Sequence, residues 1–206
     1  MRAYLSSHGL GSDPGALSGL VAGNGRIGVI RNALDFSTDR ERLERGRNRE
    51  LESLAALGLT PSEIDLREHF DRPGGLAALV SRLDALWVVG GNAFVLNCAF
   101  RRSGLDGILR SMPRDEFVYA GYSAGACVLA PTLEGIHLVD DPKVRVAGYP
   151  ERLPIRSLGL LPLGIAPHWR SDHPDSARIE RAIGYFVRHG MPFVALRDGE
   201  TWITEL

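Results

Sequence analysis

Short runs of apolar residues alternate along the chain with longer segments whose apolar residues recur at the spacing of a helix. The short runs predict β-strands at residues 2–7, 26–31, 64–66, 85–89, 117–119, 192–196 and 201–204. The longer segments predict helices at residues 39–57, 74–83, 93–109 and 176–189, with a short helix that ends at residue 21 and another that begins at residue 124. Residues 85–89 are apolar throughout, which is typical of a strand at the centre of a parallel sheet.

The regular alternation of strands and helices predicts an α/β fold, a doubly wound and mostly parallel sheet with helices on both faces. The chain of 206 residues has the length of one domain, so residues 1–206 are expected to form a single one. Residues 131–163 are less regular, and short β segments are predicted there at 136–139 and 144–147. Residues 60–63 contain a proline and are predicted as a turn.

Composition and charge exclude several classes of protein. Apolar residues make up 44% of the chain and charged residues 24%, and the net charge of −1 gives no electrostatic attraction to nucleic acid or a membrane. Nothing at the N-terminus reads as a signal peptide and no apolar run is long enough to span a membrane, so a cytoplasmic location is expected. Cys98 and Cys127 are too few for a disulfide framework and lack metal-site spacing, so we expect buried free thiols.

The stretch with the clearest chemical signal is a G-x-S-x-G motif formed by Gly121, Ser123 and Gly125. It follows a predicted strand and precedes a predicted helix, which is the context of a nucleophile elbow. Glycines are needed on both sides of the serine because a Cβ there would collide with the neighbouring elements. The alternative is a Gly/Ser-rich turn that matches a short pattern by chance, and the strand–turn–helix context favours Ser123 as a nucleophile.

A serine nucleophile needs a base, and the base needs a group that orients it. His168 follows a long apolar segment and is expected at a strand end, where α/β active sites gather. Its rival, His173, lies in a polar loop beside a proline. Asp198 follows a predicted strand and precedes Gly199, and on local sequence alone a turn-forming Asp-Gly pair is as good an interpretation as a catalytic acid.

A second glycine turn, Gly90-Gly91-Asn92, also links a predicted strand to a predicted helix. Backbone N–H groups in such a turn can bind an oxyanion or the carboxylate of a substrate. Asn92 is also a good helix N-cap, and the two interpretations are compatible.

Four separated segments carry a family resemblance: residues 87–92 (WVVGGN), 121–126 (GYSAGA), 167–168 (PH) and 196–199 (LRDG). In this order they resemble the dipeptidase E family of serine peptidases, peptidase family S51, which includes aspartyl dipeptidase and, more distantly, cyanophycinase. The resemblance runs over nearly the whole chain. It implies a flavodoxin-like fold similar to that of class I glutamine amidotransferases, with a serine in place of their elbow cysteine.

The resemblance also implies roles for individual residues. Ser123 would be the nucleophile and His168 the general base, the N–H groups of Gly91 and Ala124 would form an oxyanion hole, and Asn92 would contribute to substrate binding. In dipeptidase E the triad acid is a glutamate, whereas this chain has Asp198 at the matching position and Glu200 two residues later. Asp198 is the expected acid because it directly precedes the glycine, and Glu200 stays open as an alternative.

The expected function is therefore a serine exopeptidase for short peptides, of dipeptidase or aminopeptidase type, without a cofactor or a metal ion. Members of the family prefer an N-terminal aspartate, for which Arg170 and Arg178 are candidate cations. A surface helix that carries arginines is at least as good an interpretation of these two residues. The family also suggests a homodimer.

Three alternatives stay open at this stage. An esterase or another acyl hydrolase could use the same triad, and a non-catalytic binding protein could share the amidotransferase fold. A metal hydrolase built on His168, Asp172, His173 and Asp175 is disfavoured, because these residues lie in a polar loop without helical spacing.

Overall fold

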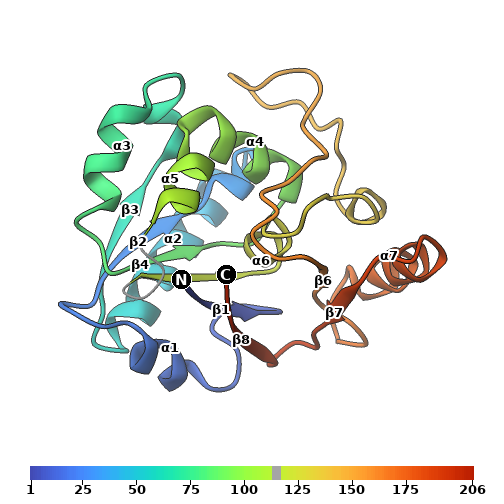
Figure 1. The fold of residues 1–206 in the computed structure, drawn as a ribbon, viewed down its shortest axis with the longest axis horizontal. Helices are drawn as coiled ribbons and strands as arrows, with labels where there is room; N and C mark the ends of the chain where they lie inside the picture. Colours follow the sequence, from blue (N-terminus) through green and yellow to red (C-terminus); the bar gives the residue numbers. More distant parts are fainter. Residues whose placement is uncertain (113–116) are drawn as a thin grey trace.

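The structure is a computed structural model that describes residues 1–112 and 117–206. Its centre is a six-stranded sheet in the order β3-β2-β4-β5-β1-β8, drawn in Figure 1. The strands are β1 (Arg2–Ser6), β2 (Arg26–Ile30), β3 (Thr60–Ile64), β4 (Ala85–Val88), β5 (Val118–Tyr122) and β8 (Thr201–Glu205). Neighbouring strands are parallel except β8, which pairs antiparallel with β1 at one edge. The prediction of a mostly parallel α/β sheet is confirmed.

The helices are α1 (Pro14–Leu20), α2 (Arg40–Ala55), α3 (Pro73–Val80), α4 (Ala93–Ser103), α5 (Leu105–Ser111), α6 (Ala124–Cys127) and α7 (Ser176–Arg188). Side-chain oxygens of Asp13, Asp39 and Asn92 accept N–H groups at the starts of α1, α2 and α4. The helix predicted over 93–109 is two helices, because Gly104 adopts the left-handed conformation at φ 77° and ends α4. None of the helices in the described segments is long and apolar enough to cross a lipid bilayer.

The four inner strands of the sheet, β1, β2, β4 and β5, bury both of their faces, as their apolar sequences require. On β4, Leu86 and Val88 belong to a core shared with α3, α4, α5 and α6. The alternate residues Ala85 and Trp87 belong to a second core shared with α1 and α2, among them Leu17. Figure 1 shows α3 and α5 on one side of the sheet and α1 on the other.

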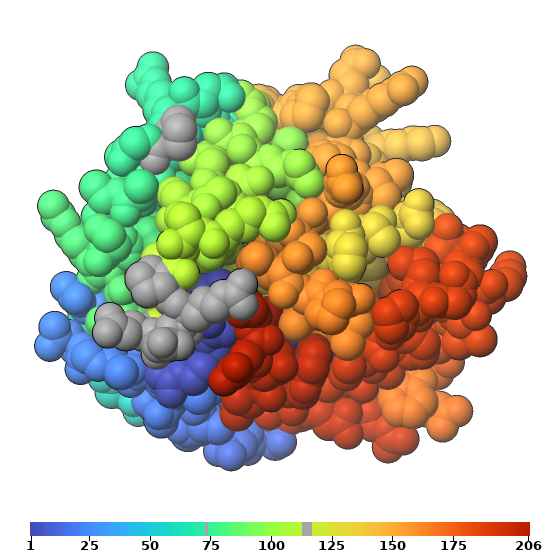
Figure 2. Space-filling model, in the orientation of Figure 1, coloured from blue at the N-terminus to red at the C-terminus, as the bar shows by residue number. Residues whose placement is uncertain are grey.

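A second, two-stranded parallel sheet lies beside the first and consists of β6 (Gly164–Ala166) and β7 (Phe193–Ala195), with α7 between them in the chain. The irregular segment before β6 packs against α4, where Asn97 donates hydrogen bonds to the backbone carbonyls of Pro154 and Arg156 at 2.8 and 2.9 Å. In Figure 2 this segment, in orange, borders the yellow-green surface of α4 and α5.

Four local predictions were wrong. The third strand is Thr60–Ile64 rather than residues 64–66, and the predicted turn at 60–63 belongs to this strand. β3 pairs only with β2, so Pro61, which lacks an N–H donor, is tolerated on this edge strand. Residues 136–139 form a 3₁₀ helix, Ile136–Leu138, and residues 144–147 contain a turn and no strand.

The close approach of the motif glycines to β4 gives a stability prediction. A Cβ on Gly125 would lie 2.2 Å from the carbonyl oxygen of Val88, a backbone atom that cannot move aside. We expect Gly125→Ala to lower the free energy of unfolding by about 2 kcal/mol or more. Urea denaturation measures this change.

The matched control is Gly107→Ala in α5, where a Cβ meets no atom within 4 Å. Alanine should stabilise this helix by up to about 1 kcal/mol. Equal stability of the two variants would contradict the close packing of the elbow on β4.

Candidate active site

The carboxyl ends of β1, β4 and β5 meet at one edge of the large sheet, where open α/β sheets hold their sites. Ser123 directly follows β5 and has φ 49° and ψ −115°, a strained conformation for a residue with a side chain. The flanking Gly121 and Gly125 allow this turn to lie against β4, because a Cβ on either would reach the Val88 carbonyl oxygen at 3.0 Å or less. The turn therefore has the strand–turn–helix geometry expected of a nucleophile elbow.

The small sheet presents the other two predicted residues. In the parallel pair β6–β7, Ala166 is in register with Ala195. His168 comes two residues after Ala166, and Asp198 comes three residues after Ala195. Both residues therefore lie beyond the same end of the small sheet. The N–H of Trp169 donates to the Leu196 carbonyl at 3.0 Å, which continues the pairing beyond the strands.

The structure brings Ser123, His168 and Asp198 together in one hydrogen-bonded chain. The Nε2 atom of His168 lies 3.1 Å from the Ser123 Oγ, and its Nδ1 atom lies 2.7 Å from the Asp198 Oδ1. Glu200 does not take part, since its carboxylate accepts the Arg197 N–H at 2.8 Å within its own turn. This geometry favours Asp198 over Glu200 as the acid.

Ser7, which the sequence did not single out, connects these groups. Its hydroxyl donates to the Asp198 Oδ1 at 2.7 Å and accepts the backbone N–H of His168 at 2.7 Å. Ser7 is fully buried just beyond the end of β1. A polar residue at the end of a buried strand was the available signal, but nothing in the sequence linked it to residues more than 150 positions away.

Burial and hydrogen bonding set the protonation states of the pair. Burial lowers the pKa of His168 below its usual value, against the raising effect of the Asp198 carboxylate. Burial alone would raise the pKa of Asp198, but hydrogen bonds from Ser7 and His168 lower it below its usual value. At neutral pH the arrangement is therefore a neutral imidazole oriented by an ionised carboxylate, as a general base requires.

Gly91 and Ala124 lie on the wall of the same cavity, next to Ser123. Gly91 has φ 145°, and a Cβ there would lie 2.5 Å from the Ala33 carbonyl oxygen, so the turn requires glycine. Among the hydrogen bonds of the described residues, none uses the N–H of Gly91 or of Ala124 as donor. Both N–H groups thus stay available for an oxyanion.

Asn92 caps α4, as one of the two interpretations expected. Its Oδ1 accepts the N–H groups of Phe94 and Val95 at 2.9 and 3.1 Å, and its Nδ2 donates to the Asp141 carbonyl at 3.0 Å. The side chain is nearly buried at 6% exposure and borders the cavity. Its contribution to substrate binding stays a prediction.

Ser123 and His168 border a cavity of about 470 Å³, which is the size of a small-ligand site. Three carboxylates line it, those of Asp140, Asp141 and Asp175, and so does Arg178. Burial raises the pKa of Asp140 to about 7, although its carboxylate accepts the Ala93 N–H at 2.8 Å. Asp140 gave no signal in the sequence, because an acid in an irregular segment forms no pattern.

The two arginines considered for substrate selection lie in different places. Arg178 borders the cavity, with its guanidinium 3.2 Å from the Asp175 carboxylate. Arg170 does not border it, and its guanidinium lies over the Trp169 ring and 3.6 Å from Glu180.

The sequence model of peptidase family S51 matches residues 41–204. The chain belongs to this family. It is 33% identical over 150 residues to peptidase E of Streptomyces coelicolor, and 33% identical over 121 residues to a Drosophila melanogaster protein named a probable alpha-aspartyl dipeptidase.

These matches cover 70% and 56% of this chain, but only 58% and 47% of the two relatives. The S51 chain thus spans about half the length of the curated relatives it matches.

Two solved structures share the fold. One is a Listeria monocytogenes protein described as a candidate peptidase E, with a TM-score of 0.71 and 19% identity over 100% of this chain and 98% of its own. The other is a peptidase from an acI-B1 Actinobacterium, with a TM-score of 0.71 and 16% identity over 99% of this chain and 83% of its own. At these identities the likeness supports the α/β fold alone.

The position of Ser7 gives a prediction for this S51 chain. Ser7→Ala removes the hydroxyl that bonds both Asp198 and the His168 backbone, so the imidazole loses part of its support. We expect kcat for peptide hydrolysis to fall about 10- to 100-fold, the equivalent of one hydrogen bond to a charged group. Steady-state kinetics measures this effect.

Ser81→Ala is the control, since the exposed Ser81 hydroxyl donates to the Ala78 carbonyl of its own helix, far along the chain from the site residues. Ser7→Gly should resemble Ser7→Ala if the hydroxyl is what matters. A wild-type kcat in Ser7→Ala would show that His168 and Asp198 are held in place without the Ser7 hydroxyl.

Proposed function

We propose that this chain is a serine exopeptidase that hydrolyses short peptides through Ser123, His168 and Asp198. The observation that carries the proposal is the pair of contacts at 3.1 and 2.7 Å that joins the three side chains, of which Ser123 and His168 lie at the wall of the cavity. Membership of peptidase family S51 supports the reaction class.

The proposed reaction follows the roles that this geometry permits. The Ser123 Oγ attacks the carbonyl carbon of the peptide bond while His168 accepts the hydroxyl proton. The N–H groups of Gly91 and Ala124 stabilise the oxyanion of the tetrahedral intermediate. His168 then protonates the leaving amine, and a water molecule, activated by the same imidazole, releases the acyl group from the serine.

The cavity favours substrates with a free N-terminus. The buried carboxylate of Asp140 lies among other acids, and an α-ammonium group beside it would stabilise its ionised form. Arg178 offers a guanidinium for an acidic side chain, since a guanidinium can bind a carboxylate through two hydrogen bonds. These groups support an exopeptidase over an ester hydrolase, which needs no charged subsite for an amino group.

The first test concerns the nucleophile and its base. Ser123→Ala should lower kcat at least about 10⁴-fold in a protein that stays folded, and His168→Ala should cause a similar loss. The double variant should lose little more, because the two residues act as a unit. Steady-state hydrolysis of dipeptides measures these effects.

His137→Ala is a control at a histidine outside the cavity lining, and it should keep wild-type kcat. Near-wild-type turnover by Ser123→Ala would refute the serine-peptidase proposal.

The second test separates the two acids of the turn. Asp198→Asn keeps the shape of the side chain but removes the charge that orients His168, and in serine proteases the matching change lowers kcat about 10⁴-fold. Glu200→Gln should have a small effect, because the Arg197 N–H is the one group among the described residues that its carboxylate bonds. A severe loss in Glu200→Gln with normal kcat in Asp198→Asn would assign the acid to Glu200.

The third test concerns the N-terminal residue of the substrate. Arg178→Gln should lower kcat/KM for Asp-X dipeptides relative to Ala-X dipeptides by at least about tenfold, the value of one lost charge-assisted hydrogen bond. N-acetylation of either peptide should abolish hydrolysis.

Arg170→Gln is the matched control, since this arginine lies outside the cavity lining. An unchanged Asp/Ala ratio in Arg178→Gln would exclude Arg178 as the selecting cation, and hydrolysis of acetylated peptides would exclude an aminopeptidase-type site.

A further inference from the structure

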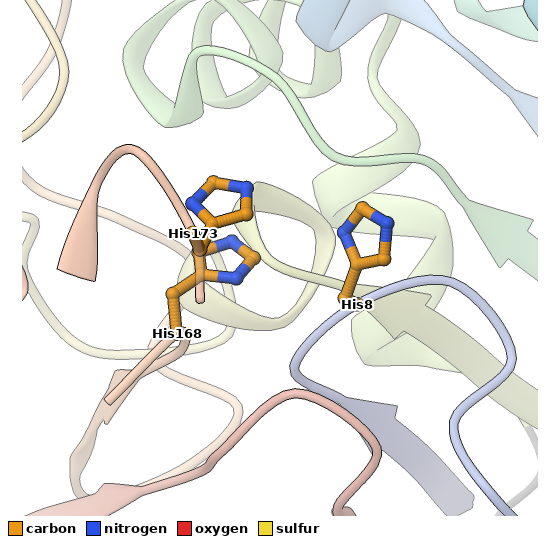
Figure 3. A group of neighbouring side chains, drawn as sticks. All are labelled: His8, His168 and His173. Carbon is orange, nitrogen blue, oxygen red and sulfur yellow. The ribbon is translucent and has the colours of Figure 1, made fainter. Parts of the chain in front are cut away.

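Three histidines gather at the active-site cavity, although the proposed reaction uses only one of them. The rings of His168 and His173 are stacked with centroids 3.6 Å apart and planes 6° apart. The His8 ring lies 6.0 and 5.8 Å from them and faces the stacked pair in Figure 3. One ring nitrogen from each histidine lies within 4.8 Å of the others, and no other such group of histidine, cysteine or acidic residues occurs in the described part of the chain.

Each of the three rings has a nitrogen that can face a common ligand. The Nδ1 atom of His173 accepts the Asp175 N–H at 3.2 Å, which leaves Nε2 open. The Nδ1 atom of His168 is bonded to Asp198, which leaves Nε2, the atom that also meets Ser123. The His8 side chain is exposed, and no hydrogen bond to its ring occurs among the described residues.

The surroundings of His168 match those of a metal-bound histidine. Metal-binding imidazoles nearly always donate their second N–H to a carboxylate or carbonyl, which fixes the tautomer and increases ligand basicity. Asp198 already makes this contact with His168. Three neutral imidazoles with an open fourth position are a known donor set for Zn²⁺.

A metal ion requires a modest rearrangement of the cluster. With metal–nitrogen bonds of about 2.0–2.1 Å, tetrahedral ligand atoms lie about 3.4 Å apart, so the 4.8 Å separation must shorten. The stacked His173 ring must also tilt, because the lone pairs of parallel rings do not converge. His8 can approach most easily, since it is exposed and precedes Gly9, a glycine with φ 51°.

We propose that His8, His168 and His173 form an inhibitory site for a divalent transition-metal ion such as Zn²⁺. Coordination would use the Nε2 lone pair of His168, the same pair that accepts the proton of Ser123. A bound ion therefore blocks the base, and hydrolysis stops until the ion leaves. The inhibition rests on the proposed function, whereas the binding of the metal does not.

Metal binding is tested first, without catalysis. Metal-free Ser123→Ala protein, which keeps all three imidazoles, is titrated with ZnCl₂ by isothermal titration calorimetry. We expect one ion per chain, and an increase of Kd of at least about tenfold when His8→Ala or His173→Ala is added. Circular dichroism verifies that each variant is folded.

The control for the titration is His189→Ala, which removes an exposed histidine that does not belong to the cluster. It should leave both Kd and stoichiometry unchanged. Absence of binding, or a Kd unaffected by the His8 and His173 changes, would overturn the site.

Inhibition is tested next on the wild-type enzyme. Zn²⁺ should inhibit dipeptide hydrolysis with an inhibition constant near the calorimetric Kd, and a chelator should restore the rate. His8→Ala should raise the inhibition constant by the same factor as the Kd. Stoichiometric binding of Zn²⁺ without inhibition would overturn the inhibitory role. If the wild-type protein does not hydrolyse dipeptides at all, the proposed function is refuted, and the titration still decides whether the metal site exists.

Discussion

The two sheets of the molecule are joined at the proposed active site through the buried hydroxyl of Ser7. This hydroxyl belongs to the loop after β1 of the large sheet, and both of its partners, His168 and Asp198, lie just beyond the strands of the small sheet. A buried polar group left without a partner costs about 1–3 kcal/mol, so these contacts favour one relative position of the two sheets. The separation between Ser123 on one sheet and His168 on the other follows from that position.

Strain and burial concentrate at the same junction. Ser123 holds a positive φ because glycines on both sides let the turn lie against the backbone of β4. His168 also has a positive φ of 59° and is 4% exposed, so its ring is confined between Asp198 and the stacked His173. Burial favours the neutral imidazole, and the adjacent carboxylate selects its tautomer. Both effects prepare the site before any substrate arrives, which is how electrostatic preorganisation operates.

Much of the fold could be predicted because buried parallel strands are apolar on both faces. Residues 85–89 show this plainly, whereas the edge strand Thr60–Ile64 is polar and contains a proline, so its sequence looks like a turn. Ser123, His168 and Asp198 each follow a strand, and this position made them candidates for the site. Ser7 and Asp140 were missed because their importance comes from contacts with distant segments, which no local pattern records. The directions of the Asp198 and Glu200 side chains could not be predicted, since a turn breaks the alternation of side-chain directions.

The central claim is that the Ser123 Oγ forms a covalent acyl-enzyme, with His168 as the general base and Asp198 as the acid that orients His168. The most direct measurement uses an activated aminoacyl ester as the substrate, because its acyl-enzyme should accumulate during turnover. The reaction is quenched rapidly with acid, and the modified peptide is located by mass spectrometry. The account predicts that the mass of the acyl group appears on the peptide that contains Ser123, and on its hydroxyl rather than the buried thiol of Cys127. An acyl group located on another residue, or turnover without any covalent adduct, would contradict the account.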